Sequence, residues 1–257
     1  MITVKNVPIG GNALVVIAGP CAIENRDTYF RIAKKVKAAG ANMLRGGAFK
    51  PRTSPHDFQG LGLEALKMIK EVRDELDMPV ISEAVQPEQV ELVAQYADVI
   101  QIGARNMHNI ALLKEAGRSG MPILLKRSFS GLIKEEWLRA TEYLQLAGNE
   151  QIILCERGIR TFEQYTRNTL DLSAVPIIKE LSNFPIIVDP SHATGRPSLV
   201  PSMALAGIAA GADGVMIEVH DEPTCAKCDG HQALSPSVFA ETVKHMRRIA
   251  QAMDRTL

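Results

Sequence analysis

The sequence predicts a single (β/α)8 TIM barrel with a short N-terminal extension, and three observations lead to this fold class. The chain has 257 residues, and a barrel of about 250 residues forms one domain. Short β-branched runs alternate eight times with amphipathic segments, which is typical of repeated βαβ units. The runs are almost continuously apolar, as expected for parallel strands that are buried on both faces. We therefore expect residues 1–257 to form one barrel domain without a regulatory domain.

The first four β/α units follow this alternation from the N-terminus. Their strands are expected over residues 13–19, 42–48, 79–84 and 99–104, and their helices over residues 28–39, 61–76, 87–96 and 109–115. Asp27 is a suitable N-cap for the first helix, because its side chain can accept a bond from the first turn. In the second helix, Leu63, Leu66 and Ile69 recur at helical spacing. These units therefore predict alternating strands and helices.

The last four units repeat the pattern to the end of the chain. Their strands are expected over residues 122–127, 151–158, 185–191 and 214–220, and their helices over residues 134–146, 172–181, 199–209 and 235–253. Ser235 is the expected N-cap of the last helix. An open doubly wound sheet is the alternative architecture, but no G-x-G-x-x-G motif follows an early strand to support it. The eight units favour a closed barrel.

The composition excludes several classes of partner. The 29 basic and 29 acidic residues balance, so there is no net field to attract nucleic acid or a membrane surface. No apolar run approaches the roughly 18 residues of a membrane span, and the start lacks a signal sequence. Four cysteines in a chain of this size do not resemble a secreted disulfide framework. We expect a soluble cytoplasmic protein with reduced thiols.

Polar or ionisable groups gather at the carboxyl ends of the expected strands. In a barrel these ends form one rim, where functional residues lie. Each of the eight strands contributes at least one such group, in the strand or in the loop after it: Cys21, Arg45, Glu83, Arg105, Lys126 with Arg127, Glu156 with Arg157, Asp189 with His192, and Glu218. The opposite strand ends are mostly apolar or begin with Pro or Gly. The sequence therefore predicts a functional site at the rim.

One set of these groups is cationic. It comprises Arg45, Lys50, Arg105, Lys126 and Arg157. Crowded cations repel one another unless anions neutralise them, and Arg with Lys is the natural pair for phosphate and carboxylate. The basic segment 45–54 has two adjacent glycines that allow close backbone approach. This set favours a phosphorylated, carboxylated substrate, whereas a solvated basic loop is the alternative for the segment.

A second set combines a thiol, an imidazole and two carboxylates. It comprises Cys21, His192, Glu218 and Asp229. This mixture suits a divalent transition metal better than Mg²⁺, which prefers oxygen ligands. Each residue also has an ordinary structural interpretation: buried filler, loop donor, salt-bridge partner and turn residue, respectively. Their common place at the rim favours the metal site.

Six motifs of this sequence resemble those of the short, type I beta form of 3-deoxy-D-arabino-heptulosonate 7-phosphate (DAHP) synthase. This form is related to 3-deoxy-D-manno-octulosonate 8-phosphate (KDO8P) synthase. The resemblance extends over residues 19–234 and depends on Gly19-Pro20-Cys21, Lys50-Pro51-Arg52-Thr53-Ser54, Ile102-Gly103-Ala104-Arg105-Asn106, Cys155-Glu156-Arg157-Gly158, Asp189-Pro190-Ser191-His192 and Glu218-Val219-His220.

The resemblance implies a (β/α)8-barrel transferase, 3-deoxy-7-phosphoheptulonate synthase, with residues 1–257 as its catalytic domain. Such enzymes condense phosphoenolpyruvate with D-erythrose 4-phosphate to give DAHP and inorganic phosphate, the first step of the shikimate pathway to chorismate and the aromatic amino acids. The resemblance implies one divalent metal ion (Mn, Fe, Co, Zn or similar) on Cys21, His192, Glu218 and Asp229. It also implies a cytoplasmic homodimer or homotetramer.

By the same resemblance, the cationic set holds phosphoenolpyruvate. Glu83 supports its phosphate through water, and Gly103 and Ala104 belong to the same substrate-binding set. The aldose phosphate is placed by Lys50, Pro51, Arg52, Thr53 and Ser54. Lys50 and His192 are candidates for moving protons at the aldehyde oxygen, and Cys21 completes the catalytic set.

The motifs that bear on the acceptor sugar resemble two different enzymes. Ala226-Lys227-Cys228-Asp229-Gly230 is similar to the KDO8P synthase version, whose acceptor is arabinose 5-phosphate. The motif at residues 50–54 and Ile159-Arg160-Thr161-Phe162-Glu163 are of the DAHP type. The motif that binds the acceptor favours erythrose 4-phosphate. A metal-dependent aldolase on the same barrel is a third possibility, and it predicts no release of inorganic phosphate from phosphoenolpyruvate.

Other residues receive structural expectations. Arg160, Glu163 and Arg167 are expected to form a salt-bridged surface. Cys225 and Cys228 have redox-pair spacing but no second pair, which favours ordinary thiols. We also hypothesise that Cys228 lies close enough to Cys21 to form an inactivating disulfide when metal is absent.

Overall fold

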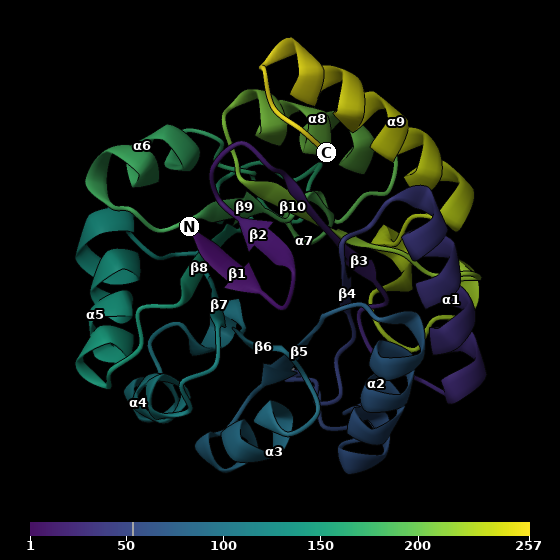
Figure 1. Cartoon of the computed structure of the whole chain (residues 1–257), viewed down its shortest axis with the longest axis horizontal. Coiled ribbons are helices and arrows are strands. Elements are labelled where there is room, and N and C mark those ends of the chain that lie inside the picture. The colour runs from purple at the N-terminus through teal and green to yellow at the C-terminus, as the bar shows by residue number, and fades with distance from the viewer. Residues whose placement is uncertain (53) are drawn as a thin grey trace.

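Eight parallel strands close into a barrel in the computed structural model, which describes residues 1–52 and 54–257 (Figure 1). The strand order is β10-β3-β4-β5-β6-β7-β8-β9. The strands are β3 (Val15–Gly19), β4 (Met43–Arg45), β5 (Val80–Ala84), β6 (Val99–Ile102), β7 (Ile123–Lys126), β8 (Ile152–Glu156), β9 (Ile186–Val188) and β10 (Gly214–Glu218). The predicted barrel is therefore confirmed, with strands shorter than expected.

The first and last strands close the barrel in continuous register. Residues 214–218 of β10 pair with residues 15–19 of β3. Gly214 lies so close to β3 that a Cβ atom there would be 2.2 Å from the Val15 carbonyl oxygen. A glycine is required at this position, because any side chain would push the two strands apart.

The helices pack around the outside of the barrel (Figure 1). They are α1 (Arg26–Ala39), α2 (Leu63–Leu76), α3 (Val90–Ala94), α4 (Ile110–Arg118), α5 (Leu138–Leu146), α6 (Ala174–Leu181), α8 (Val200–Ala209) and α9 (Pro236–Ala252). Their apolar faces join the outward-facing strand residues in one buried cluster that includes Leu66, Ile69 and Phe239. Burial of this layer supplies most of the hydrophobic driving force for folding.

Two capping predictions have different outcomes. The Ser235 side chain accepts a bond from the Val238 N–H, so the expected N-cap of α9 is confirmed. The prediction for α1 was wrong, because Asn25, and not Asp27, caps that helix by accepting from the Thr28 N–H. Asp27 lies within the first turn, where its negative charge still favours the positive end of the helix dipole.

A short antiparallel hairpin covers the amino-terminal end of the barrel (Figure 1). It consists of β1 (Ile2–Val4) and β2 (Val7–Ile9), which lie in the N-terminal extension, where no strand is predicted from the sequence. Ile2, Val4 and Ile9 are buried in the same cluster as the inward-facing residues of the barrel strands. The hairpin therefore excludes water from this end and leaves the opposite rim as the accessible mouth.

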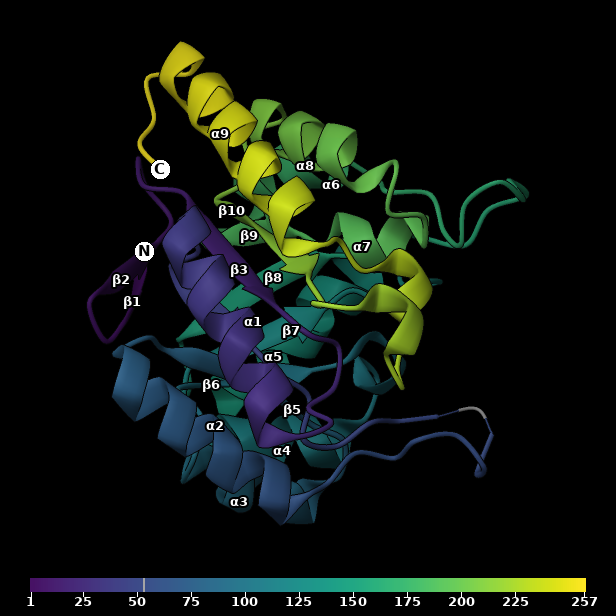
Figure 2. The same cartoon turned by 90° about the vertical axis from the view of Figure 1, so that its right-hand side faces the viewer.

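Loops at the carboxyl ends of the strands form this mouth. The loops after β4 and β8 project furthest from the barrel (Figure 2). A short helix, α7 (Pro190–Thr194), begins just after β9, whereas the predicted strand continues to residue 191. Pro190 at its first position favours this helix start. Among the described residues, no helix is long and apolar enough to cross a membrane.

Candidate functional site

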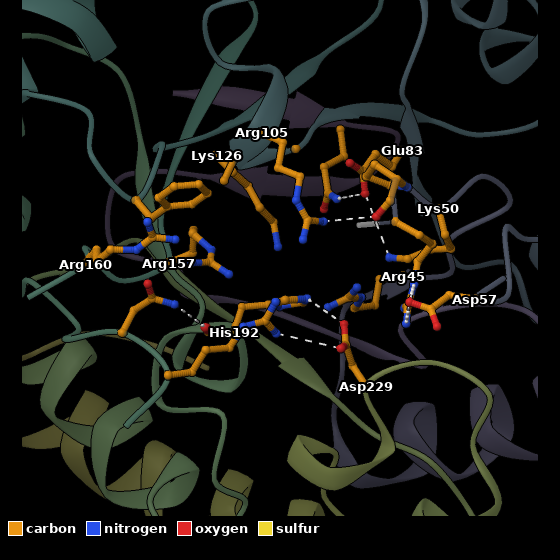
Figure 3. Close-up of a pocket in the computed structure, with 18 residues that line it drawn as sticks. Arg45, Lys50, Asp57, Glu83, Arg105, Lys126, Arg157, Arg160, His192 and Asp229 are labelled. Carbon is orange, nitrogen blue, oxygen red and sulfur yellow. Dashed lines mark hydrogen bonds and ion pairs between the residues drawn. The ribbon is translucent and has the colours of Figure 1, made fainter. Parts of the chain in front are cut away.

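A cavity of about 400 Å³ opens at the mouth of the barrel (Figure 3). Its lining includes eight Arg and Lys side chains but three carboxylates, together with polar, apolar and glycine residues. These residues are Arg45, Lys50, Pro51, Arg52, Asp57, Glu83, Gln101, Gly103, Ala104, Arg105, Lys126, Phe129, Arg157, Arg160, Arg167, Asn168, His192 and Asp229. The excess of cations makes this cavity a site for an anion with more than one negative group.

The inner cations come from strands far apart in the sequence. Arg45 ends β4 and Lys126 ends β7, while Arg157 directly follows β8 and Lys50 lies on the loop after β4. All four side chains are buried, and their sticks converge on the centre of the cavity in Figure 3. Arg105, which is exposed, reaches over the cavity and donates to the Pro51 carbonyl oxygen at 3.0 Å. The predicted cationic set is therefore gathered in one cavity.

Glu83 lies among these cations and is held tightly. Its Oε2 accepts from Gln101 Nε2 at 3.0 Å and lies 4.0 Å from Lys50 Nζ. Gly103 packs against the carboxylate so closely that a Cβ atom there would be 2.0 Å from Glu83 Oε1. Gly103 and Ala104 line the cavity beside it. The absence of a side chain at Gly103 thus leaves room for Glu83 in its present position.

The loop with residues 50–54 contributes unevenly. Pro51 and Arg52 line the cavity. Arg52 donates to Asp57 Oδ2 at 3.1 Å and to Cys228 Sγ at 3.0 Å. Ser54 is half-buried and its hydroxyl accepts from the His56 N–H at 3.3 Å. The described cavity lining does not include Ser54, and Thr53 lies outside the described residues.

The four predicted metal ligands come together beneath the cavity. One ligand atom from each of Cys21, His192, Glu218 and Asp229 lies within 4.8 Å of the others. His192 Nε2 is 3.1 Å from Glu218 Oε1 and 3.9 Å from Asp229 Oδ2. Cys21 Sγ donates to Asp229 Oδ2 at 3.3 Å. Their residues follow or end β3 and β10 or lie in α7 and the loop before α9, so only the closed barrel brings them together.

Surrounding groups orient these four side chains. Asp189 Oδ2 accepts from His192 Nδ1 at 2.7 Å, which fixes the proton on Nδ1 and leaves the Nε2 lone pair facing the cluster. Gln232 Nε2 donates to Glu218 Oε2 at 2.6 Å. Glu218 Oε1 is buried and makes no hydrogen bond among the described residues, although it forms an ion pair with Arg45 NH1 at 3.2 Å. A buried carboxylate oxygen that lacks a hydrogen bond, beside a thiol, an imidazole and a second carboxylate, fits a divalent transition metal.

The pKa values fit the same interpretation. Burial lowers the pKa of His192 to about 4, so its imidazole is neutral and can donate a lone pair. Burial, with the nearby Cys21, raises the pKa of Glu218 to about 7. Burial alone would raise the pKa of Asp229, but His192 and Arg167 hold it below its usual range. Contact with Cys228 and burial raise the pKa of the Cys21 thiol.

Two thiols lie side by side in the centre. Cys21 Sγ is 3.5 Å from Cys228 Sγ, and both cysteines are buried and reduced. Lys50 Nζ donates to Cys21 Sγ at 3.1 Å, on the side facing the cavity. Cys225, in contrast, is exposed. The proximity that the disulfide hypothesis requires is therefore present.

Several lining residues were missed or misassigned from the sequence. The salt-bridged surface expected of Arg160, Glu163 and Arg167 differs from what the described residues form, because both arginines line the cavity and Arg167 pairs with Asp229. Arg160 lies over the Phe129 ring at 4.7 Å, and Arg167 lies 3.7 Å from Asp229 Oδ1. Glu163 instead accepts from neighbouring backbone N–H groups. Their position in the loop after β8 was the available signal. Gln101, Phe129 and Asn168 carried no distinctive motif.

Comparisons with known proteins are consistent with this geometry. The model of the family described as "DAHP synthetase I family" matches residues 1–255. A phospho-2-dehydro-3-deoxyheptonate aldolase from Thermotoga maritima is 49% identical over 253 residues, which cover 98% of this chain and 75% of that protein. A 2-dehydro-3-deoxyphosphooctonate aldolase from Desulfatibacillum aliphaticivorans is 34% identical over 269 residues, covering 96% of each.

Solved structures give the same result. The crystal structure of the DAHP synthase from Thermotoga maritima matches with a TM-score of 0.96 and 49% identity, over 99% of this chain and 74% of that one. A truncated form of the enzyme from the same organism matches with a TM-score of 0.93 and 45% identity, over 99% and 93%. The resemblance inferred from the motifs is confirmed, and the chain belongs to the DAHP synthetase I family.

Proposed function

We propose that this protein is a metal-dependent DAHP synthase that condenses phosphoenolpyruvate with D-erythrose 4-phosphate, releasing inorganic phosphate. One observation carries the proposal: a cluster of four potential metal ligands lies directly beneath a cavity rich in buried cations. The family and the higher identity to the heptonate enzyme, 49% against 34% for the octonate enzyme, support this acceptor over arabinose 5-phosphate.

The inner cations suit the two anionic groups of phosphoenolpyruvate. In the proposal Arg45, Lys50, Arg105, Lys126 and Arg157 surround its phosphate and carboxylate. Glu83 sits beside Lys50 and fixes its direction, and it supports the phosphate through water. Arg52, in the loop at the outer side of the cavity, would meet the phosphate of the acceptor together with Ser54 and Thr53. Holding both anions in reacting geometry can supply roughly 7 to 11 kcal/mol of barrier reduction.

The residues that would hold the metal are Cys21, His192, Glu218 and Asp229. This mixed sulfur, nitrogen and oxygen set favours Mn, Fe, Co or Zn, but ligand type alone does not select one of them. Once bound, such an ion supplies Lewis acidity toward the aldehyde oxygen of the acceptor. Asp189 keeps His192 in the tautomer that this role requires.

Lys50 is well placed to donate a proton to the developing alkoxide. Its ammonium lies 3.1 Å from Cys21 Sγ and 4.0 Å from Glu83 Oε2, between the ligand cluster and the cationic cavity. Burial opposes its charge, but Glu83, and Cys21 when it is ionised as a thiolate, raise the pKa of Lys50, so it stays protonated. His192 is the weaker proton donor because burial keeps its imidazole neutral.

In the proposed reaction, C3 of phosphoenolpyruvate forms a bond to the aldehyde carbon. Water then adds at C2, and cleavage of the C–O bond releases inorganic phosphate with formation of DAHP. We also infer a homodimer or homotetramer in the cytoplasm, as the family resemblance implies. The large exposed side chains of Phe162 and Tyr165 on the loop after β8 are compatible with a contact between subunits.

The test is a phosphate-release assay with phosphoenolpyruvate as donor. Erythrose 4-phosphate and arabinose 5-phosphate are compared as acceptors, with chelator and after readdition of Mn²⁺, Co²⁺ or Zn²⁺. We expect chelator-sensitive release with the four-carbon acceptor. Lys126→Met should abolish most activity, whereas Lys70→Met, on the exposed surface of α2, is the matched control. Faster turnover with arabinose 5-phosphate, or no release with either sugar, would contradict the proposal.

A further inference from the structure

A buried ion network lies behind the cavity and includes two residues at the ends of neighbouring strands. Arg127 follows β7 and Glu156 ends β8, and both are buried. Arg127 NH1 donates to Glu156 Oε2 at 2.9 Å and to Asp171 Oδ2 at 2.8 Å. Neither Arg127 nor Glu156 is among the described residues that line the cavity, although each is adjacent in sequence to one that is: Lys126 and Arg157.

This network holds both ends of the loop between β8 and α6. At the start of the loop, Glu156 Oε1 accepts from the Gly158 N–H at 2.6 Å. At its end, Asp171 immediately precedes the segment that enters α6. A single guanidinium therefore joins two points that are 15 residues apart in the chain, since it binds Glu156 and Asp171. Its Nε also donates to the Gly131 carbonyl oxygen at 2.8 Å, in the loop after β7.

The loop between these anchors delivers cations to the cavity. Arg157, Arg160 and Arg167 all belong to it and line the cavity. Its two arms are joined by reciprocal backbone bonds between Ile159 and Thr169 at 2.8 and 2.9 Å. The loop projects well beyond the barrel in Figure 2, and its returning arm is bound to α7 by the Arg167 and Asn168 N–H groups, which donate to the Thr194 and Ala193 carbonyl oxygens. The Arg160 N–H also donates to the Phe129 carbonyl oxygen at 2.7 Å, against the loop after β7.

Stability alone does not account for such a network. Removing charges from water costs several kcal/mol per ion, and well-packed apolar side chains of the same volume often serve a fold equally well. The planar guanidinium group of an arginine, in contrast, has several N–H donors in a rigid arrangement and can hold several acceptors in one geometry. Arg127 binds the carboxylates of Glu156 and Asp171 through NH1 and the Gly131 carbonyl group through Nε, and so connects the end of β8 with two loops. The geometry is that of a clamp on the arginine-bearing loop.

We propose that Arg127, with Glu156 and Asp171, is a positioning residue that sets the arginines of the β8–α6 loop and thereby the affinity for the anionic donor substrate. Arg127 acts through Arg157 and its loop and does not touch the substrate. The inference relies on the proposed function only for the identity of the anion, phosphoenolpyruvate. It predicts that anion binding falls more than metal binding, because the four metal ligands belong to other elements of the mouth and the loop reaches them through Arg167, which lies 3.7 Å from Asp229 Oδ1.

The central variant is Arg127→Lys, which keeps the positive charge but loses the guanidinium group. Arg139→Lys is the matched control, since Arg139 is exposed and pairs with Glu142 at 2.7 Å. Phosphoenolpyruvate and Mn²⁺ are titrated separately by calorimetry. We expect Arg127→Lys to weaken phosphoenolpyruvate binding about tenfold, the scale of a lost charge-assisted hydrogen bond, while Mn²⁺ affinity falls much less and the control stays unchanged.

Hydrogen exchange provides the second readout. In Arg127→Lys, amides of residues 158–170 should exchange faster than in the original protein, while peptides from β3 and β10 keep their rates. Asp171→Ala removes the acceptor at the far end of the loop, at a half-buried site, and tests the same idea if Arg127→Lys fails to fold. It should also weaken phosphoenolpyruvate binding and speed exchange in the loop.

Two results would overturn the clamp. One is an unchanged affinity for phosphoenolpyruvate in every one of these two variants that folds. The other is a parallel loss of Mn²⁺ affinity, which would indicate general loosening of the mouth. Measurements on the unmodified protein separate this inference from the proposed function. If the protein binds phosphoenolpyruvate but releases no phosphate with either sugar, the proposed function is contradicted, and the effect of Arg127 on phosphoenolpyruvate affinity can still be measured.

Discussion

Gly103→Ala tests how closely the cavity is built around Glu83. The backbone at Gly103 has φ of −68°, which alanine adopts without strain. The new Cβ atom, however, would lie 2.0 Å from Glu83 Oε1. A non-bonded contact needs roughly 3.5 Å, so the carboxylate must move by more than about 1 Å. This displacement breaks its bond from Gln101 and its pairing with Lys50.

The loss of one charge-assisted hydrogen bond costs about 1.5 to 3 kcal/mol. If the binding free energy of phosphoenolpyruvate decreases by this amount, the affinity for it drops by about 10- to 150-fold. Calorimetric titration of Gly103→Ala, Glu83→Ala and the double variant measures it. Because Glu83→Ala removes the clashing atoms, the double variant should bind no more weakly than Glu83→Ala alone. Near-normal affinity in Gly103→Ala, or losses that simply add in the double variant, would refute the reasoning.

Three further predictions concern the proposed metal centre. Metal binding should release protons and strengthen as pH rises from 6 to 8. Glu218, whose pKa is raised to about 7, and the Cys21 thiol, whose pKa is also raised, must lose protons to bind the metal, whereas His192 is already neutral. Calorimetry in buffers of different ionisation enthalpy measures the proton release, and finding none would contradict the prediction. Asp189→Asn should weaken metal binding about 10- to 100-fold, because the group that orients His192 is altered. A competition titration with a chromogenic chelator measures the dissociation constant of the metal, and an unchanged value would contradict the orienting role of Asp189. Mild oxidation of the metal-free protein should join Cys21 to Cys228, which lie 3.5 Å apart, and prevent metal binding; a thiol count that does not fall by two, or that falls equally in Cys228→Ser, would end the hypothesis.

Patterns along the chain were sufficient to predict the barrel and the polar rim. Apolar periodicity reports which residues face a core, and parallel strands place their carboxyl ends on one rim. Arg45, Lys126 and Glu218 lie at or beside such ends, so their convergence followed from strand assignment alone. The family motifs then added the chemistry, which periodicity does not carry.

Other features left little or no trace in the local sequence. The β1–β2 hairpin is only a few residues long on each side, and its apolar residues gain their role from the open barrel end that they cover. Arg160 and Arg167 lie in a loop, where no periodicity indicates that the chain folds back over the mouth. Arg127 looked like another cation of the rim, but it turns away from the cavity to bind Glu156 and Asp171.

The order of strands and helices, the residue types of the rim and the family membership can be read from the amino-acid sequence, because they depend on neighbours along the chain. The tertiary structure decided which rim side chains face the cavity and which pair behind it, how close Cys21 lies to Cys228, and how the loop after β8 is anchored. These outcomes depend on distances between segments far apart in the chain, which closure of the barrel fixes and local pattern does not record.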